Sequence, residues 1–231
     1  MKGKWFCLYI LTATAVLMIC HWGSKAVTVI AEHSPLARKH CIIIDAGHGG
    51  VDGGATSCTG ILESAYNLQI ALRLNDLFRL LGYDTHMIRT TDISVYTKGE
   101  TIAQKKISDL KERVRITNET ENALLISIHQ NTFPDSRYSG AQVFYPDTGD
   151  SKVLACQLQT AFIDALNPGS HRQCKKSDGV YLMEHITRPG ILVECGFLSN
   201  PQEEANLRSR EYQQQLCCVI VSTVDSYLSN T

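Results

Sequence analysis

From Cys41 onward, short runs of apolar residues alternate with longer segments in which apolar residues recur every three or four positions. The short runs predict buried β-strands, and the longer segments predict amphipathic helices. The expected strands are Cys41–Asp45, Tyr83–Arg89, Ala123–His129, Gly140–Tyr145, Gly179–Met183 and Gly190–Glu194. The expected helices carry apolar stripes over residues 71–81, 107–117, 154–165 and 216–228.

This alternation is typical of an α/β fold, in which helices cover both faces of a mostly parallel sheet. Runs such as "ALLIS" and "GILVE" are apolar at nearly every position, as expected of strands that are buried on both faces. No internal repeat or low-complexity tract interrupts the pattern. We therefore predict a single α/β domain over residues 41–229.

The N-terminal region has a different pattern. Two lysines among the first four residues precede the unbroken apolar run Trp5–Cys20. A basic start followed by an apolar run of this length is typical of a signal peptide or an N-terminal membrane anchor. We expect residues 1–31 to direct export in one of these two ways and residues 32–40 to form a linker.

Composition narrows the possible functions. The hydrophobic fraction of 44% is that of a globular protein, and the net charge of −1 gives no support for binding nucleic acid. Of the nine cysteines, two lie in the N-terminal apolar run, which leaves an odd number, and no CxxC pair is present. Because several of the remaining cysteines lie in apolar surroundings, we expect buried free thiols rather than disulfides or a cysteine metal site.

Polar side chains occur at the ends of three predicted strands. His48 follows the first strand, His129 ends the third, and Glu194 ends the last. A fourth candidate, Glu63, lies in the first turn of the first helix. Functional groups of open α/β sheets collect at the carboxyl ends of the strands, so we expect these four side chains to share one edge.

Two imidazoles and one carboxylate are a recurrent ligand set for catalytic zinc, with a fourth position kept for water. A further carboxylate that does not bind the metal can then accept a proton from that water. No HExxH segment is present, so the ligands would converge from distant segments. On the residues alone, Glu63 could instead serve only the helix dipole. Glu194, at the end of the apolar run "ILVE", would be costly to bury without a partner.

The glycines around His48 raise a second possibility, a phosphate-binding loop. The segment "DAGHGGVDGG" does not fit GxGxxG, and it lacks the lysine and hydroxyl of a P-loop. We therefore expect these glycines to let the backbone turn sharply and bring His48 close to a metal and a bulky substrate.

Four segments, in order along the chain, resemble motifs of the zinc-dependent N-acetylmuramoyl-L-alanine amidases of the bacterial cell wall. They are "IIIDAGHGGVDGGA", "ILES", "SIHQN" and "ILVECGFLSN", and the similarity extends over residues 41–228. The resemblance implies that one zinc ion is held by His48, Glu63 and His129, and that the family's catalytic glutamate corresponds to Glu194. It also implies a mixed, mostly parallel sheet of about six strands with helices on both faces.

The substrate implied by the resemblance is peptidoglycan, cut between the lactyl group of N-acetylmuramic acid and the L-alanine of the stem peptide. Glu194 would accept the proton of water and deliver it to the departing alanine nitrogen. Asp45 is a candidate to accept the spare N–H of a ligand histidine, with capping of the loop as the alternative. Gln130 and Asn131 are candidates for hydrogen bonds to the substrate.

The chain carries no cell-wall-binding repeat, so a membrane tether or a recruiting partner protein is expected to bring it to its substrate. A short amidase with "SIHQNTFP" after the third strand is most similar to family members that act in sporulation. This similarity implies a location outside the cytoplasmic membrane, in the cell-wall space or between the forespore membranes. It also implies a role in forming the muramic-δ-lactam of the spore cortex, which germination requires. Two other functions stay open: a zinc peptidase acting within the stem peptide, and a non-catalytic wall-binding protein.

Overall fold

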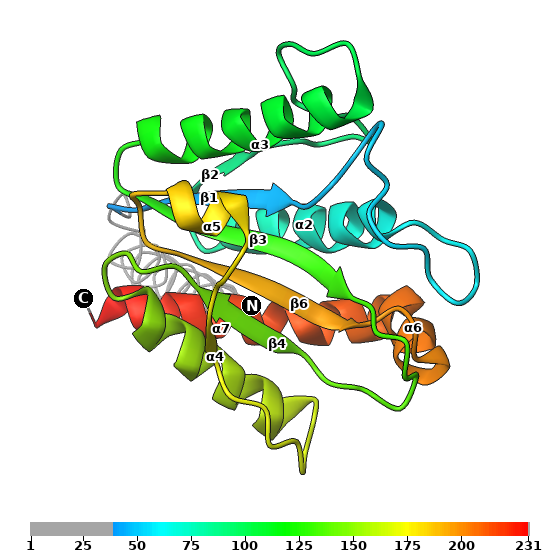
Figure 1. Ribbon diagram of the computed structural model, residues 1–231. Coiled ribbons are helices and arrows are strands. Elements are labelled where there is room, and N and C mark those ends of the chain that lie inside the picture. Colours follow the sequence, from blue (N-terminus) through cyan, green and yellow to red (C-terminus); the bar gives the residue numbers. More distant parts are fainter. Residues whose placement is uncertain (1–38, 231) are drawn as a thin grey trace, which may run out of the picture. The chain divides into compact units, whose positions relative to one another are not determined.

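The computed structural model describes residues 39–230 (Figure 1). The signal peptide or anchor expected over residues 1–31 lies outside this range, as does nearly all of the expected linker. Within residues 39–230, no helix combines the length and the apolar character needed to cross a membrane.

The described elements are built around one six-stranded sheet with the strand order β2-β1-β3-β6-β4-β5. β2, β1, β3 and β6 run parallel, whereas β4 is antiparallel to β6 and carries β5 parallel to itself. In Figure 1 the arrowheads of β1, β3 and β6 accordingly point the same way and that of β4 points back. The strands are β1 (Cys41–Ala46), β2 (Asp84–Met87), β3 (Ala123–Asn131), β4 (Gln142–Tyr145), β5 (Lys175–Lys176) and β6 (Gly190–Phe197). This mixed, mostly parallel sheet confirms the predicted fold class.

The apolar residues of the central strands alternate between two cores, because successive side chains of a strand point to opposite faces. Ile42, Ile126 and Val193 belong to the core that the sheet shares with α2, α4 and α7. Ile43 and Leu125 belong to the opposite core, which α3 and α5 cover. The helices are α2 (Glu63–Leu80), α3 (Ile102–Glu119), α4 (Ser151–Ala165), α5 (Tyr181–His185), α6 (Pro201–Arg208) and α7 (Arg210–Ser229). Helices therefore lie on both faces of the sheet, as predicted.

One predicted strand is wrong. The segment Gly179–Met183 forms a turn at Gly179, with a φ of 72°, and then enters the short helix α5. A brief apolar run does not by itself distinguish a strand from a buried helix. Here the side chains of Leu182 and Met183 are buried as part of a short helix, in the core on the α3 and α5 face of the sheet. The edge strand β5 was not expected, because its two residues are both exposed lysines.

The apolar stripe predicted for α3 is also partly wrong. Ile107 is 54% exposed, whereas Thr117, at the other end of the predicted stripe, is buried. The other buried positions of this helix are Ser108 and Arg113, which the stripe did not include. The buried face of α3 is polar because the guanidinium of Arg113 forms a buried ion pair with Asp45 of β1. The other three predicted stripes lie on α2, α4 and α7.

The expectation of free thiols fails at one pair of cysteines. Cys156 of α4 and Cys174, directly before β5, form a disulfide. Cys195 and Cys217 are buried and free, as expected, whereas Cys218 is exposed. The disulfide attaches the short edge strand to the helix beside it.

Candidate metal centre and active site

Three of the predicted side chains meet at the carboxyl end of the sheet. His48 follows β1, His129 lies near the end of β3, and Glu63 is the first residue of α2. One ligand atom from each of these residues lies within 4.8 Å of the other two. The structure thus brings His129 together with Glu63, which lies 66 positions earlier in the chain, and with His48 from the loop that precedes Glu63.

Glu63 lies between the two imidazoles. Its Oε2 is 3.2 Å from Nε2 of His48, and its Oε1 is 3.0 Å from Nδ1 of His129. Burial alone would raise the pKa of the Glu63 carboxyl, but the two histidines hold that pKa well below its usual range. The carboxyl group is therefore ionised, the form in which a carboxylate binds a metal.

Neighbouring backbone and amide groups fix the Glu63 carboxylate. The backbone N–H of Ala55 donates to its Oε2 at 3.0 Å, and that of Gln130 donates to its Oε1 at 3.1 Å. The side-chain amide of Asn67, one turn further along α2, donates to Oε1 at 3.2 Å. Because each donor comes from a different part of the fold, the carboxylate has one defined orientation.

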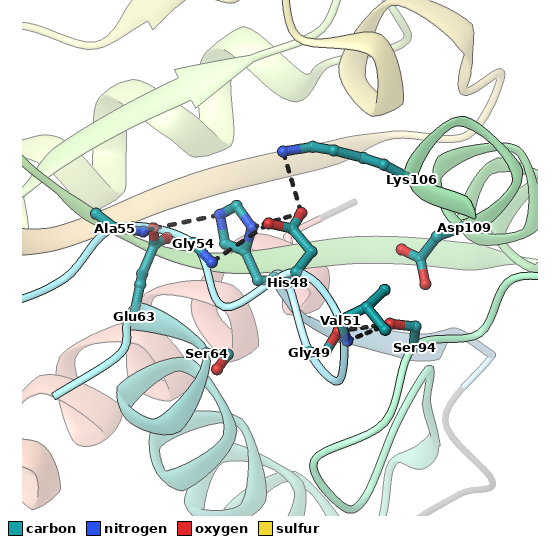
Figure 2. Close-up of polar contacts among 12 residues, drawn as sticks. His48, Gly49, Val51, Gly54, Ala55, Glu63, Ser64, Ser94, Lys106 and Asp109 are labelled. Atoms are coloured by element: carbon teal, nitrogen blue, oxygen red, sulfur yellow. Dashed lines mark hydrogen bonds and ion pairs between the residues drawn. The ribbon is translucent and has the colours of Figure 1, made fainter. Parts of the chain in front are cut away.

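His48 belongs to a loop with unusual backbone geometry. Its φ is 61°, a left-handed value that is uncommon for a residue other than glycine. Its Nδ1 lies 3.0 Å from Oδ2 of Asp52, and Lys106 lies 3.1 Å from the same oxygen (Figure 2). Burial would lower the pKa of His48, but Glu63 and Asp52 outweigh that effect and raise it. The contact with Asp52 leaves Nε2 facing Glu63.

Two glycines leave the room that these side chains occupy. A Cβ atom at Gly47 would lie 2.2 Å from Nε2 of His129. A Cβ atom at Gly54 would lie 2.6 Å from Oε2 of Glu63 and 2.8 Å from the His48 ring. The glycines of this loop therefore make space for the cluster, in agreement with the role expected for them.

Glu194 of β6 lies beside the cluster. It is the register partner of His129 on the neighbouring parallel strand, so the two side chains point to the same face of the sheet. Its Oε2 is buried and accepts no hydrogen bond from the residues that the structure describes. Burial, assisted by the nearby charge of Glu63, raises the pKa of Glu194 to about 7. A carboxyl group of this kind can both accept and release a proton near neutral pH.

Asp45 does not contact either histidine through a hydrogen bond. Its carboxylate forms an ion pair with Arg113 and accepts a hydrogen bond of 2.7 Å from the hydroxyl of Ser127. The carboxylate that contacts a candidate ligand is that of Asp52, which the sequence reasoning missed. Asp52 is four residues after His48, and only the sharp turn of the loop brings it back.

Gln130 and Asn131 differ in their surroundings. The side chain of Gln130 is buried and donates to Asn67 at 3.1 Å, so it supports the residue that orients Glu63. Asn131 is partly exposed at the end of β3, where its carbonyl accepts a hydrogen bond from the N–H of Leu198. Of the two, Asn131 is the one whose side chain stays open to a substrate.

The donor set fits a zinc ion. Two imidazole nitrogens and one carboxylate oxygen from His48, His129 and Glu63 form a compact group, and such a set is typical of catalytic zinc with one position left open. The unpartnered Oε2 of Glu194 lies on the same face of the sheet. A buried oxygen without a partner is costly unless something in the working site pairs with it.

Comparison with known proteins agrees with this arrangement. Residues 42–226 match the family described as N-acetylmuramoyl-L-alanine amidase. A germination-specific N-acetylmuramoyl-L-alanine amidase of Bacillus subtilis is 36% identical over 84% of this chain and 82% of its own length. The solved structure of the CwlD amidase from Clostridioides difficile, in complex with the GerS lipoprotein, is 36% identical. It superposes with a TM-score of 0.79 over 83% of this chain and 100% of that chain.

A second solved structure, an N-acetylmuramoyl-L-alanine amidase from Clostridium difficile 630, is 30% identical. It has a TM-score of 0.71 over 83% of this chain and 98% of that chain. The match spans nearly all of the described sheet and includes all four residues of the site. The chain belongs to the N-acetylmuramoyl-L-alanine amidase family.

Proposed function

We propose that this chain holds one zinc ion through His48, Glu63 and His129 and hydrolyses the amide bond between N-acetylmuramic acid and L-alanine in peptidoglycan. Glu194 is the residue that moves the proton. The observation that carries this proposal is the compact His-Glu-His group with the unpartnered carboxylate oxygen of Glu194 on the same face of the sheet, in a chain of the amidase family.

The protein groups divide the work between orientation and proton transfer. The chemistry that zinc supplies at such a site is Lewis acidity, which polarises the scissile carbonyl and makes water more acidic. Asp52 holds Nδ1 of His48 and thereby presents Nε2 to the cluster. Asn67 and the backbone N–H groups of Ala55 and Gln130 hold the carboxylate of Glu63.

Glu194 performs the two proton transfers that amide hydrolysis requires. Its Oε2 accepts a proton from the attacking water, since no described donor occupies that oxygen. The same group then delivers the proton to the alanine nitrogen, because an amine leaves far more easily than an amide anion. Its position next to His129 in the sheet register keeps it on the face where the candidate ligands lie.

Family membership favours the amidase over the two other functions that the sequence left open. A peptidase acting within the stem peptide would use the same zinc chemistry, but the matching family is described by the bond to L-alanine. A non-catalytic wall-binding protein has no need of the compact and oriented cluster found here.

The similarity to a germination-specific amidase and to CwlD leads us to propose a role in maturing the spore cortex. The relative from Clostridioides difficile forms a complex with a lipoprotein, and we propose that a partner protein likewise recruits this chain to its substrate. A location outside the cytoplasmic membrane agrees with the Cys156–Cys174 disulfide, since disulfides persist in oxidising compartments.

A peptidoglycan digest combined with a metal analysis tests the proposal. The purified full chain is expected to contain one zinc ion per molecule. Its products from spore-cortex peptidoglycan, separated by mass, should carry a free lactyl carboxyl on muramic acid and a free L-alanine amine on the released peptide. Cuts only within the stem peptide would establish the peptidase. An absence of products from zinc-loaded protein, with or without the candidate partner, would contradict catalysis.

A further inference from the structure

Two buried arginines surround the His48 loop, and neither belongs to the proposed ligand set. Arg89 follows β2, and Arg113 lies on α3, so they approach the loop from different elements. Each is only 2% exposed. Burying a guanidinium is costly unless its donors find partners, so the positions of those partners show what each side chain holds.

The partners of Arg89 are all backbone carbonyls. Its Nε donates to Ala46 at 2.8 Å, and its Nη1 donates to Thr91 at 3.1 Å. Its Nη2 donates to Gly47 at 3.0 Å and to Ser64 at 2.9 Å. Gly47 directly precedes His48, and Ser64 directly follows Glu63. One nitrogen of Arg89 therefore ties together the backbones beside two candidate zinc ligands.

Arg113 holds the same loop from the side of α3. Its Nη2 donates to the carbonyl of His48 at 2.8 Å, and its Nη1 donates to that of Ala46 at 3.0 Å. Its ion pairs with Asp45 and Asp109 fix the guanidinium in turn. The carbonyls of three successive residues, Ala46 to His48, thus each accept a hydrogen bond from one or both arginines.

The backbone of His48 explains why this loop requires such support. A left-handed φ costs a residue with a side chain free energy, and it persists only where the surrounding structure enforces it. The peptide groups on both sides of His48 carry the carbonyls that the arginines bind. Without those donors the loop would relax toward ordinary φ values and turn the imidazole away from Glu63.

We propose that Arg89 and Arg113 are positioning residues that hold the His48 loop in the conformation that binds the metal. Arg89 additionally sets the distance between His48 and Glu63. The inference rests on the proposed zinc site, although its effect on the loop does not require the metal to be present.

The variant Arg89→Lys tests the proposal because lysine keeps the charge but cannot reach four carbonyls with one planar group. In the metal-free full chain, hydrogen exchange at Gly49 and Asp52 is the first measurement. The backbone N–H of each of these residues donates to the carbonyl of the other across the loop. We expect both amides to exchange at least ~10-fold faster in the variant, while the amides of α7 keep their rates.

The second measurement is zinc affinity, determined by competition with a chromogenic chelator at a temperature where the variant is folded. Loss of a residue that orients metal ligands typically weakens binding about 10- to 100-fold, and we expect a loss of that size for Arg89→Lys. In turnover assays at saturating zinc we expect kcat to fall while KM stays within about twofold, since both arginines are buried.

Two control variants separate positioning from general stability. Arg115→Lys alters an exposed arginine of α3 that pairs with Glu112 and Glu119. Val224→Ala weakens the core under α7, on the opposite face of the sheet from Arg113. Both should retain wild-type zinc affinity while folded. If Arg89→Lys loses no more affinity than Val224→Ala, or if its loop amides exchange at the wild-type rate, the proposal is wrong.

Failure of the proposed function would look different. If the wild-type chain bound no zinc, the hydrogen-exchange comparison alone would still decide the role of Arg89 in the loop. If Arg89→Lys did not fold, Arg113→Lys would take its place with the same measurements and the same criteria, because it removes the donor to the His48 carbonyl.

Discussion

Gly47 lies so close to His129 that replacing it with alanine is expected to displace the imidazole. The new Cβ would lie 2.2 Å from Nε2 and 2.3 Å from Cε1 of the ring, whereas ordinary contact begins at 3.4 Å. The ring and the methyl group must therefore separate by about 1.2 Å, the difference between 3.4 and 2.2 Å. The φ of Gly47 is one that alanine tolerates, so the effect is steric and local.

A shift of this size is large for a ligand whose Nδ1 lies 3.0 Å from Glu63. Misplacement of a catalytic group by about 1 Å can reduce the rate ~100-fold, and we expect kcat/KM of Gly47→Ala to fall by that order. Zinc affinity should fall about 10- to 100-fold. Both quantities can be measured on the purified chain, by peptidoglycan digestion and by competition with a chelator.

Gly53→Ala is the matched control for this variant. Gly53 lies in the same loop and also has no left-handed φ, but a Cβ there would meet only the end of the Leu62 side chain, at 2.9 Å. Leu62 is 45% exposed and can move aside. We expect near wild-type zinc binding and turnover in Gly53→Ala. If Gly47→Ala behaved like this control, the His129 ring would not be held where the structure places it, and the steric reasoning would be refuted.

Three further predictions follow from the site and its surroundings. Glu194→Gln should bind zinc normally but lose about 10²- to 10⁴-fold in turnover, because the amide cannot accept a proton; full activity would remove Glu194 from the mechanism. Burial would raise the pKa of Asp45, but Arg113 and Ser127 outweigh it and lower that pKa in the folded protein. The ionised carboxylate therefore stabilises the fold above about pH 4, the ordinary pKa of aspartate. This stabilisation is lost as the pH falls through the lower pKa of the folded state. In urea unfolding of the metal-free protein, Asp45→Asn should lower the free energy of unfolding by about 3 kcal/mol at pH 7. Between pH 7 and pH 3 this free energy should fall less in the variant than in the wild type, and an equally steep fall would contradict the prediction. Replacing Cys156 and Cys174 by serine should lower the free energy of unfolding by about 3 kcal/mol, the value expected for a disulfide that joins residues 18 positions apart. Zinc affinity should not change. A change in affinity would show that the edge strand influences the site.

The rule that functional groups collect at the carboxyl ends of parallel strands was sufficient to predict the meeting of His48 and His129. Each lies on or directly after a buried strand, and the sheet order places β1 beside β3. Glu194 could be included in the predicted site because burying a carboxylate at the end of an apolar strand costs free energy unless another group pairs with it. The assignment of Glu63 to the metal depended on the resemblance to the family, since a glutamate in the first turn of a helix has an ordinary explanation.

The parts that could not be predicted depend on contacts between distant segments. Arg113 occupies the buried face of α3, where periodicity favoured the apolar residues around Ile107, because its partner Asp45 lies 68 positions earlier in the chain. The contact of Asp52 with His48 depends on the left-handed backbone of His48, which no composition rule anticipates. Hydrophobic periodicity locates elements, but it does not show which polar side chains the packed elements will enclose.

The three candidate ligands come from a loop, a helix and a strand, and this origin links metal uptake to folding. The unfolded chain contains no preformed site, because His48 and His129 are separated by most of the first half of the domain. Zinc would therefore bind only the native state and stabilise it in proportion to the logarithm of the free zinc concentration relative to the dissociation constant. The melting temperature of this enzyme should then rise with the concentration of free zinc. A chelator should lower it even though the packing of the hydrophobic core stays the same.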